Sequence, residues 1–323
     1  MNYKNIVISG GGILGSQIAF QSAYCGFNVT ILIRVEDSKE DVESKLDKLV
    51  ETYKETINIM DKEGADSTNW ARGIASKDSF NKDDCLNKVD NARKNIKIEA
   101  DQQVALSDCD LLIESITENF DVKTAFYKQI STLLPEKTVV VTNSSTLLPS
   151  KLAKSTGRSE KYLSLHFANS IWKNNIAEVM KHAGTDDKYF NELIAFAEAI
   201  NMIPLAARGE KSGYLLNSML VPFLLSAMDL VANGISDPET IDKAWTYGTG
   251  APKGPFQIID TVGLETARNI VLQYQKVPDV FDPLLRKMML PYNYDGMLRI
   301  LDEYMNSGKT GKAVGEGFYK YDK

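Results

Sequence analysis

Short runs of Val, Ile and Leu alternate with longer helical patterns over the first two thirds of the chain. Six of these runs have the composition of β-strands, and several have an unbroken run of Val, Ile or Leu at their centre, as is typical of parallel strands covered on both faces. We expect strands at residues 5–9, 28–33, 96–99, 110–114, 138–142 and 162–166. Helical segments separate most of them, which predicts right-handed crossovers and an α/β, Rossmann-like, doubly wound sheet.

A long charged segment, residues 35–95, lies between the second and third predicted strands. Its apolar residues recur at helical spacing, at Val42, Leu46, Leu49, Val50, Tyr53 and Ile57. This spacing predicts a helical-hairpin insertion, two antiparallel helices that project from the sheet. Its many charges are more typical of a solvated helix face than of a binding patch.

The alternation of strands and helices stops near Arg208. An apolar stretch follows at residues 214–231, but five residues interrupt it: Asn217, Ser218, Pro222, Ser226 and Asp229. We therefore expect a buried helix there and no membrane span. A helix start at Asp237-Pro238 and further helical patterns continue to the C-terminus. We expect an α/β domain at residues 1–207 and an all-α domain at residues 208–323.

Composition excludes several classes of function. The 323 residues include 37 Lys and Arg against 43 Asp and Glu, a net charge of −6, so no large basic field for nucleic acid is expected. The first residues are too short an apolar run for a signal peptide. Three cysteines (Cys25, Cys85 and Cys109) without close pairing indicate reduced thiols in the cytoplasm, with no disulfide frame and no metal site.

A glycine-rich loop follows the first predicted strand. The run Gly10-Gly11-Gly12-Ile13-Leu14-Gly15 has the spacing GxGxxG and opens a helix. Glycine permits the tight turn, the close approach of backbone to a pyrophosphate, and the packing of helix on strand. We expect Gly10, Gly12, Ile13, Leu14 and Gly15 to bind a dinucleotide, since a purely structural glycine turn is the weaker interpretation in this strand–turn–helix context.

The residue at the end of the second predicted strand helps to distinguish NAD from NADP as the cofactor. An acidic residue there accepts the ribose hydroxyls of NAD, but this chain has Ile33 followed by Arg34. Loss of the carboxylate removes repulsion against a 2′-phosphate, and a guanidinium can pair with that phosphate. We therefore favour NADP(H) slightly over NAD(H). The alternative is that Glu36 or Asp37 replaces the missing acid and serves NAD.

Three polar residues form a candidate catalytic group. Ser145 and His166 follow or end predicted strands, and ligands of doubly wound sheets bind outside the carboxyl ends of strands. An imidazole is a suitable base for the hydroxyl proton of an alcohol, and Glu178 can orient it. A histidine at a strand end is more often structural, but the upstream cofactor motif favours catalysis. His182 lacks such a setting, and we interpret it as a surface or packing residue.

Motifs along nearly the whole chain then resemble the L-3-hydroxyacyl-CoA dehydrogenase family, which includes 3-hydroxybutyryl-CoA dehydrogenases. They are the glycine loop and the segments at residues 118–123, 143–147, 166–169, 216–222, 248–256, 260–264 and 315–319. The resemblance implies hydride transfer between NAD(P) and the 3-position of a short- or medium-chain acyl-CoA, and a homodimer formed through the helical domain.

The resemblance also assigns roles to residues. His166 would be the general base, Glu178 its partner, and Ser145 a hydrogen-bond partner of the substrate's 3-oxygen. Asn217 would complete the catalytic group by reaching across the interdomain cleft. Glu118 and Lys123 would lie along the nicotinamide half of the cofactor, and Asn143 and Ser145 would also contact it.

Departures from the family pattern keep other functions open. The loop after the base has Ala168 and Ser170 where the family usually has Phe and Pro, and the CoA-binding residues of the insertion do not align, leaving Lys45, Lys48 and Lys54 as candidates. One alternative is a dehydrogenase of a free hydroxy acid of the L-gulonate or L-carnitine type. Another is a non-catalytic dinucleotide-binding relative.

Overall fold

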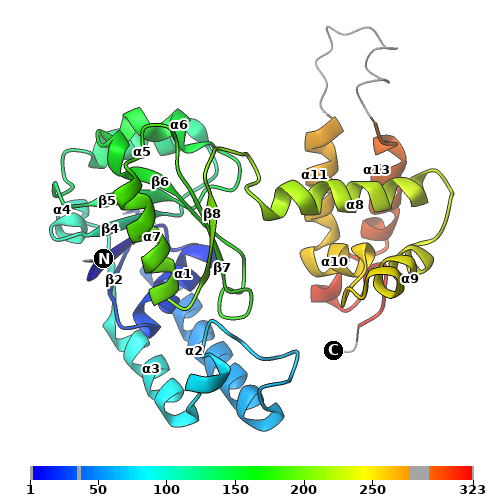
Figure 1. Cartoon of the computed structure of the whole chain (residues 1–323), viewed down its shortest axis with the longest axis horizontal. Coiled ribbons are helices and arrows are strands. Elements are labelled where there is room, and N and C mark those ends of the chain that lie inside the picture. The colour runs from blue at the N-terminus through cyan, green and yellow to red at the C-terminus, as the bar shows by residue number, and fades with distance from the viewer. Residues whose placement is uncertain (1–2, 35–37, 276–290, 322–323) are drawn as a thin grey trace, which may run out of the picture. The chain divides into compact units, whose positions relative to one another are not determined.

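The computed structural model describes residues 3–34, 38–275 and 291–321 and divides into two units, residues 1–215 and 216–323 (Figure 1). The first unit contains an eight-stranded sheet, and its last strand ends at the predicted boundary, Ala207. The division by contacts lies after Leu215, because the segment that follows that strand remains packed on the first unit.

The sheet has the strand order β3-β2-β1-β4-β5-β6-β7-β8. Its strands are β1 (Asn5–Ser9), β2 (Asn28–Leu32), β3 (Ile96–Glu99), β4 (Leu111–Glu114), β5 (Val139–Thr142), β6 (Tyr162–Phe167), β7 (Ile176–Met180) and β8 (Ile203–Ala207). The six predicted strands are all present, and their neighbours pair in parallel. This arrangement confirms the predicted doubly wound sheet.

Two strands were missed from the sequence. β7 runs antiparallel to β6, and β8 pairs in parallel with β7. β8 lies at the sheet edge and contains Pro204, which an edge strand tolerates because one side of its backbone has no ladder partner. The pair β6–β7 matters for function, since it reverses the chain next to His166.

Helices cover both faces of the sheet, and the alternation of side chains along each strand assigns the faces. Ile6 and Ile8 of β1 face the helices α1 (Ile13–Tyr24), α2 (Lys39–Glu63), α3 (Lys82–Asn95) and α7 (Asp187–Ala199). Val7 faces α4 (Gln102–Leu106), α5 (Phe120–Ile130) and α6 (Pro149–Leu152). Period-two burial on both faces explains the unbroken apolar runs.

The insertion is the predicted helical hairpin, formed by α2 and α3, and it extends away from the sheet (Figure 1). Three ion pairs show that the helices are antiparallel: Asp47–Arg93, Lys54–Asp90 and Asp61–Lys82. The residue number increases along α2 from pair to pair while that of the partner on α3 decreases. The predicted apolar positions of α2 are buried or partly buried in the hydrophobic core on the sheet face that α1, α2, α3 and α7 cover. The charges of these pairs lie on the solvated side, as expected.

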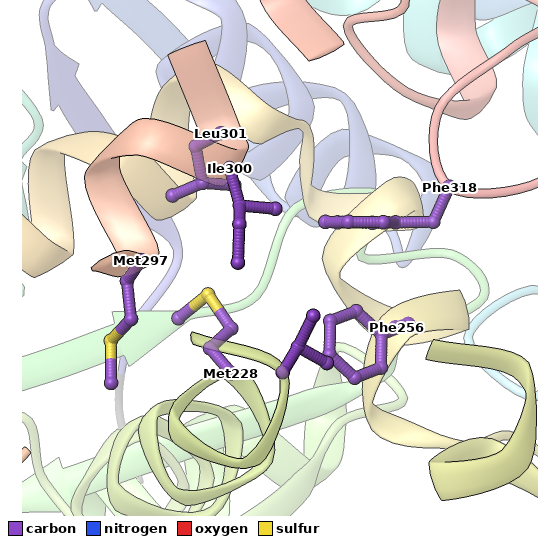
Figure 2. Close-up of a pocket in the computed structure, with 7 residues that line it drawn as sticks. Met228, Phe256, Met297, Ile300, Leu301 and Phe318 are labelled. Atoms are coloured by element: carbon purple, nitrogen blue, oxygen red, sulfur yellow. The ribbon is translucent and has the colours of Figure 1, made fainter. Parts of the chain in front are cut away.

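The second unit is helical, as predicted. It contains α8 (Leu216–Ala232), α9 (Pro238–Thr249), α10 (Pro255–Val262), α11 (Leu264–Gln275) and α13 (Tyr294–Asn306). Its core includes a narrow apolar gap where Met228 and Phe256 face Met297, Ile300 and Phe318 (Figure 2). α8 is buried along one side, while its Met219 is 67% exposed. Every helix within the described ranges is too short or too polar to span a lipid bilayer.

Candidate active site

The glycine loop connects β1 to α1, and each glycine in it has a different surrounding. Gly10 has φ +109°, and a Cβ there would lie 2.5 Å from the carbonyl oxygen of Ser115. A Cβ on Gly15 would lie 2.1 Å from the carbonyl oxygen of Gly10, so the helix packs directly on the loop. Gly12 is the N-cap of α1, without a side-chain cap, and its Cβ position faces open space. This leaves first-turn N–H groups of α1 for an anion.

A cleft of about 860 Å³ opens above this loop. It is lined by the loop itself, by the end of β2, by residues 115–117 after β4, by α5 and by the first turns of α2. The position is the expected one for a dinucleotide, outside the carboxyl ends of parallel strands. The open space beside Gly12 and the uncapped helix fit a pyrophosphate, so the residues present suit a nicotinamide dinucleotide.

Ile33 and Arg34, at the end of β2, both line this cleft, where the adenosine ribose of a dinucleotide would lie. The Ile33 side chain is 7% exposed and belongs to the hydrophobic core between the sheet and α1, α2, α3 and α7. Its Cγ2 lies beneath Gly11. Arg34 is exposed. The two acids that the sequence offered as substitutes, Glu36 and Asp37, lie outside the described residues.

Ser145, His166 and Glu178 form a continuous hydrogen-bonded chain. His166 Nδ1 lies 2.9 Å from Glu178 Oε2, and His166 Nε2 lies 3.1 Å from Ser145 Oγ. The antiparallel register places His166 directly opposite Glu178, which explains how two residues twelve apart meet. Ser145 follows β5, the neighbour of β6 on its other side. The structure therefore brings the three predicted residues together.

Burial and hydrogen bonds fix the orientation of the imidazole. The Glu178 side chain is 1% exposed, and its second oxygen accepts the backbone N–H of Leu215 at 2.9 Å. An ionised carboxylate only accepts hydrogen bonds, so the bond to Glu178 requires a proton on Nδ1, and the tautomer protonated there presents Nε2 as an acceptor toward Ser145. The His166 side chain is 12% exposed, so part of the imidazole is accessible.

Tyr214 packs against one side of His166, a role that the sequence pattern did not predict. Its ring stacks on the imidazole, with centroids 4.7 Å apart and planes at 17°. Its hydroxyl donates to the carbonyl oxygen of Ser144 at 2.7 Å, and burial raises the pKa of this phenol. Tyr214 has φ +51°, an uncommon value for an aromatic residue, and this turn directs Leu215 toward Glu178. A tyrosine in an apolar run carries no pattern that distinguishes it from a core residue.

Two family models match the chain in succession. The model for the 3-hydroxyacyl-CoA dehydrogenase NAD binding domain matches residues 5–210, and the model for the C-terminal domain matches residues 213–321. The chain belongs to the 3-hydroxyacyl-CoA dehydrogenase family. The resemblance seen in the sequence is thereby confirmed, and the chain is an NAD-dependent oxidoreductase of the class that acts on CH–OH groups.

Relatives span nearly the full chain. Human mitochondrial hydroxyacyl-coenzyme A dehydrogenase is 30% identical over 322 residues, which cover 98% of this chain and 91% of that protein. A 3-hydroxybutyryl-CoA dehydrogenase of Clostridioides difficile is 25% identical, with coverage of 98% and 99%. A solved structure of a diketoreductase, described for dual catalysis of dicarbonyl compounds, is 41% identical with a TM-score of 0.78 and coverage of 99% and 100%.

The residues expected along the nicotinamide half of the cofactor form a dense polar group. Glu118 Oε1 accepts hydrogen bonds from Ser144 Oγ at 2.5 Å and from the backbone and hydroxyl of Thr146 at 3.0 and 2.8 Å. Burial acts to raise the pKa of Glu118, but these hydrogen bonds and the Lys123 cation hold it below its usual value. Glu118 therefore stays ionised at neutral pH.

Lys123 and Asn143 are engaged inside the protein. Lys123 is 1% exposed and forms an ion pair with the fully buried Glu114, whose other oxygen accepts the hydroxyls of Tyr127 and Thr142 at 2.8 Å each. Asn143 Oδ1 accepts the backbone N–H of Phe167 at 3.0 Å. Both side chains hold strand ends in place, and their contact with a cofactor stays a prediction.

The remaining site candidates occupy other places. Asn217 is the second residue of α8 in the second unit, half-buried, and its catalytic role stays a prediction. Lys54 is committed to Asp90, and Lys45 bonds Asp41 and the Gly11 carbonyl beside the dinucleotide cleft. His182 is a packing residue, 7% exposed: its Nδ1 accepts Gly184 N–H at 3.0 Å while its Nε2 donates to the Ser159 carbonyl.

The loop after His166 follows a path that excludes proline at residue 170. Ser170 has φ +59° and donates its backbone N–H to Gln17 Oε1 at 2.8 Å, whereas proline has φ near −65° and no N–H. The hairpin insertion also fixes this loop, because Gly73 N–H donates to the Trp172 carbonyl at 2.9 Å and leaves no room for a Cβ. The loop after His166 is thus built differently from the family's usual Phe-Asn-Pro loop.

Proposed function

We propose that this protein transfers a hydride between NAD(P) and the 3-position of a short-chain 3-hydroxyacyl-CoA or 3-oxoacyl-CoA. The observation that carries the proposal is the chain Ser145–His166–Glu178, which joins the carboxyl ends of β5 and β6 to the antiparallel strand β7 in the unit that also contains the dinucleotide cleft. A redox sensor without catalysis has no need of such a proton relay.

In the proposed mechanism, His166 Nε2 takes the proton of the substrate's 3-hydroxyl as the C–H bond breaks. When bound, the nicotinamide would accept the hydride, or supply it in the reverse direction. Glu178 stabilises the imidazolium that forms, and its bond from Leu215 keeps the carboxylate in place. Ser145 Oγ, 3.1 Å from Nε2, orients the 3-oxygen for proton transfer. In reduction the same proton returns from His166 to the new alkoxide oxygen.

We also propose NADP(H) as the preferred cofactor. The support is the buried aliphatic Ile33 at the position of the usual acid, with exposed Arg34 beside it in the cleft. A guanidinium recognises a phosphate by charge and by paired hydrogen bonds. Glu36 and Asp37 remain the alternative that would serve NAD.

One assay tests substrate and cofactor together. The protein is mixed with acetoacetyl-CoA and either NADPH or NADH, and the loss of absorbance of the reduced nicotinamide is followed. The proposal expects turnover, with a higher kcat/KM for NADPH. Absence of turnover with short- and medium-chain acyl-CoA substrates rejects the substrate class, and equal or better efficiency with NADH rejects the cofactor preference. Binding of cofactor with no turnover of any substrate would favour the non-catalytic alternative.

A second candidate is the reduction of a 3-oxo compound that lacks CoA. The observation in its favour is the 41% identity to a diketoreductase over the full chain. The hairpin agrees with it: acidic residues outnumber lysines along α2, Lys54 is paired, and exposed Lys48 lies in a surface groove with Glu43, Asp47 and Glu51. A CoA phosphate would need cations there. The test compares kcat/KM for acetoacetyl-CoA and a 3-oxo ester with the reduced cofactor, and follows oxidation of L-gulonate and L-carnitine with the oxidised cofactor.

Two further properties complete the proposal. We propose a homodimer formed through the second unit, supported by exposed apolar side chains on its helices, of which Met219 is 67% and Tyr247 87% exposed. Light scattering after gel filtration measures the mass.

We propose a cytoplasmic location, because Cys25, Cys85 and Cys109 are all free. Fractionation of cells that produce the protein tests it.

A further inference from the structure

The first turns of α2 form one wall of the dinucleotide cleft, although α2 belongs to the hairpin insertion. Val42 packs beneath the glycine loop so closely that a Cβ on Gly11 would lie 2.5 Å from its Cγ2. Ser38, Asp41 and Lys45 line the same cleft as Ile33 and Arg34. The insertion therefore contributes side chains to the cofactor's adenosine end.

Lys45 is the cation that α2 brings to this wall. Its Nζ lies 3.3 Å from the carbonyl oxygen of Gly11, at the loop that approaches the cofactor. It also pairs with Asp41, one turn earlier on the helix. The Lys45 side chain is 28% exposed and that of Asp41 63%, so the pair faces the open cleft. Arg34 brings a second cation to the same end.

We propose that Lys45 is a specificity-determining residue that binds the 2′-phosphate of NADP(H), with Asp41 as the anion that the phosphate displaces. The inference rests on the proposed use of NADP(H). A phosphate carries more charge and more acceptor oxygens than a carboxylate, so it competes for an ammonium that is already paired. A neutral ribose hydroxyl, as in NAD(H), leaves the Lys45–Asp41 pair intact. The missing acid at Ile33 and the added cation at Lys45 then act in the same direction.

The test uses two small nucleotides and needs no turnover. Adenosine 2′,5′-bisphosphate and 5′-AMP differ by the 2′-phosphate alone, and calorimetry gives Kd for each with the full chain. We expect tighter binding of the bisphosphate by the unmodified protein. Lys45→Gln should weaken bisphosphate binding roughly tenfold and change 5′-AMP binding by less than about twofold. Asp41→Asn should tighten bisphosphate binding, because it removes the competing anion.

Lys62→Gln is the matched control, since it removes the same charge from the exposed end of α2, outside the cleft. It should leave both Kd values unchanged. Equal losses for both nucleotides in Lys45→Gln would mean that Lys45 supports the glycine loop only, and would overturn the inference. So would equal binding of the two nucleotides by the unmodified protein. Discrimination through Lys45 without turnover of acetoacetyl-CoA would instead reject the proposed substrate and leave the inference standing.

Discussion

His166 and Glu178 lie directly opposite each other in the antiparallel pair β6–β7, with His166 Nδ1 2.9 Å from Glu178 Oε2. Backbone register thus sets the distance between the His166 imidazole and the Glu178 carboxylate. The same carboxylate accepts the N–H of Leu215, which follows the ring that stacks on His166. The orientation of the imidazole therefore depends on two strands and on the turn at Tyr214.

Replacing the base tests the mechanism directly. His166→Gln keeps a polar side chain of similar size but cannot take the substrate proton, so we expect kcat to fall by about a hundredfold or more. Cofactor binding, measured by quenching of protein fluorescence, should stay unchanged because the cleft lining does not include His166. An unchanged rate would show that another group moves the proton, even though the family is correct.

Glu178→Gln tests the orienting role separately. The amide is nearly isosteric and can still accept the Leu215 N–H, but it no longer carries the charge that stabilises imidazolium, and its NH₂ can turn the ring to the wrong tautomer. We expect kcat to fall by roughly ten- to a hundredfold, with KM for the cofactor unchanged. A melting temperature close to that of the unmodified protein would confirm that the loss is not one of folding. A variant with full kcat would contradict a positioning role for Glu178.

The sequence predicted the parts of this site that local pattern carries. Short runs rich in Val, Ile and Leu predicted the six strands, and glycine spacing predicted the cofactor loop. β7 was missed because its five residues, Ile-Ala-Glu-Val-Met, include a buried Glu that interrupts the apolar pattern, and β8 because of Pro204 and its exposed edge position. Tyr214 and the side-chain partners of Lys123 depend on tertiary contacts, which have no signature in the order of residues.

Lys123 gives a stability prediction that distinguishes its structural role from cofactor binding. Lys123→Met leaves the fully buried Glu114 without its cation, and breaking a buried pair in this way costs about 3–5 kcal/mol of unfolding free energy. Urea denaturation without cofactor measures this loss. The matched control is Lys128→Met on the exposed side of α5, which should change stability by less than about 1 kcal/mol. Equal stability of the two variants would contradict the structural role.

Acid should destabilise the protein partly through Glu118. Its pKa is lower in the folded protein than in the unfolded chain, so its contribution to stability is full above the ordinary carboxyl pKa and is lost as pH falls through the folded pKa. We expect Glu118→Gln to flatten the fall in unfolding free energy below about pH 4.5, the upper end of the ordinary range for this side chain. Urea titrations at several pH values measure the slope. An unchanged slope would mean that the hydrogen bonds from Ser144 and Thr146 do not persist in solution.

The cofactor preference should reverse when the missing acid is restored. Ile33→Asp places a carboxylate where the ribose hydroxyls of NAD bind and where a 2′-phosphate is repelled, so the ratio of kcat/KM for NADPH to that for NADH should fall by about ten- to a hundredfold. The position is 7% exposed, and a buried carboxylate would lower stability, so the melting temperature is measured alongside. Arg34→Gln is the second variant: it keeps the core intact and should lower the same ratio by weakening NADPH alone. A ratio unchanged in both variants would show that selectivity does not depend on the end of β2.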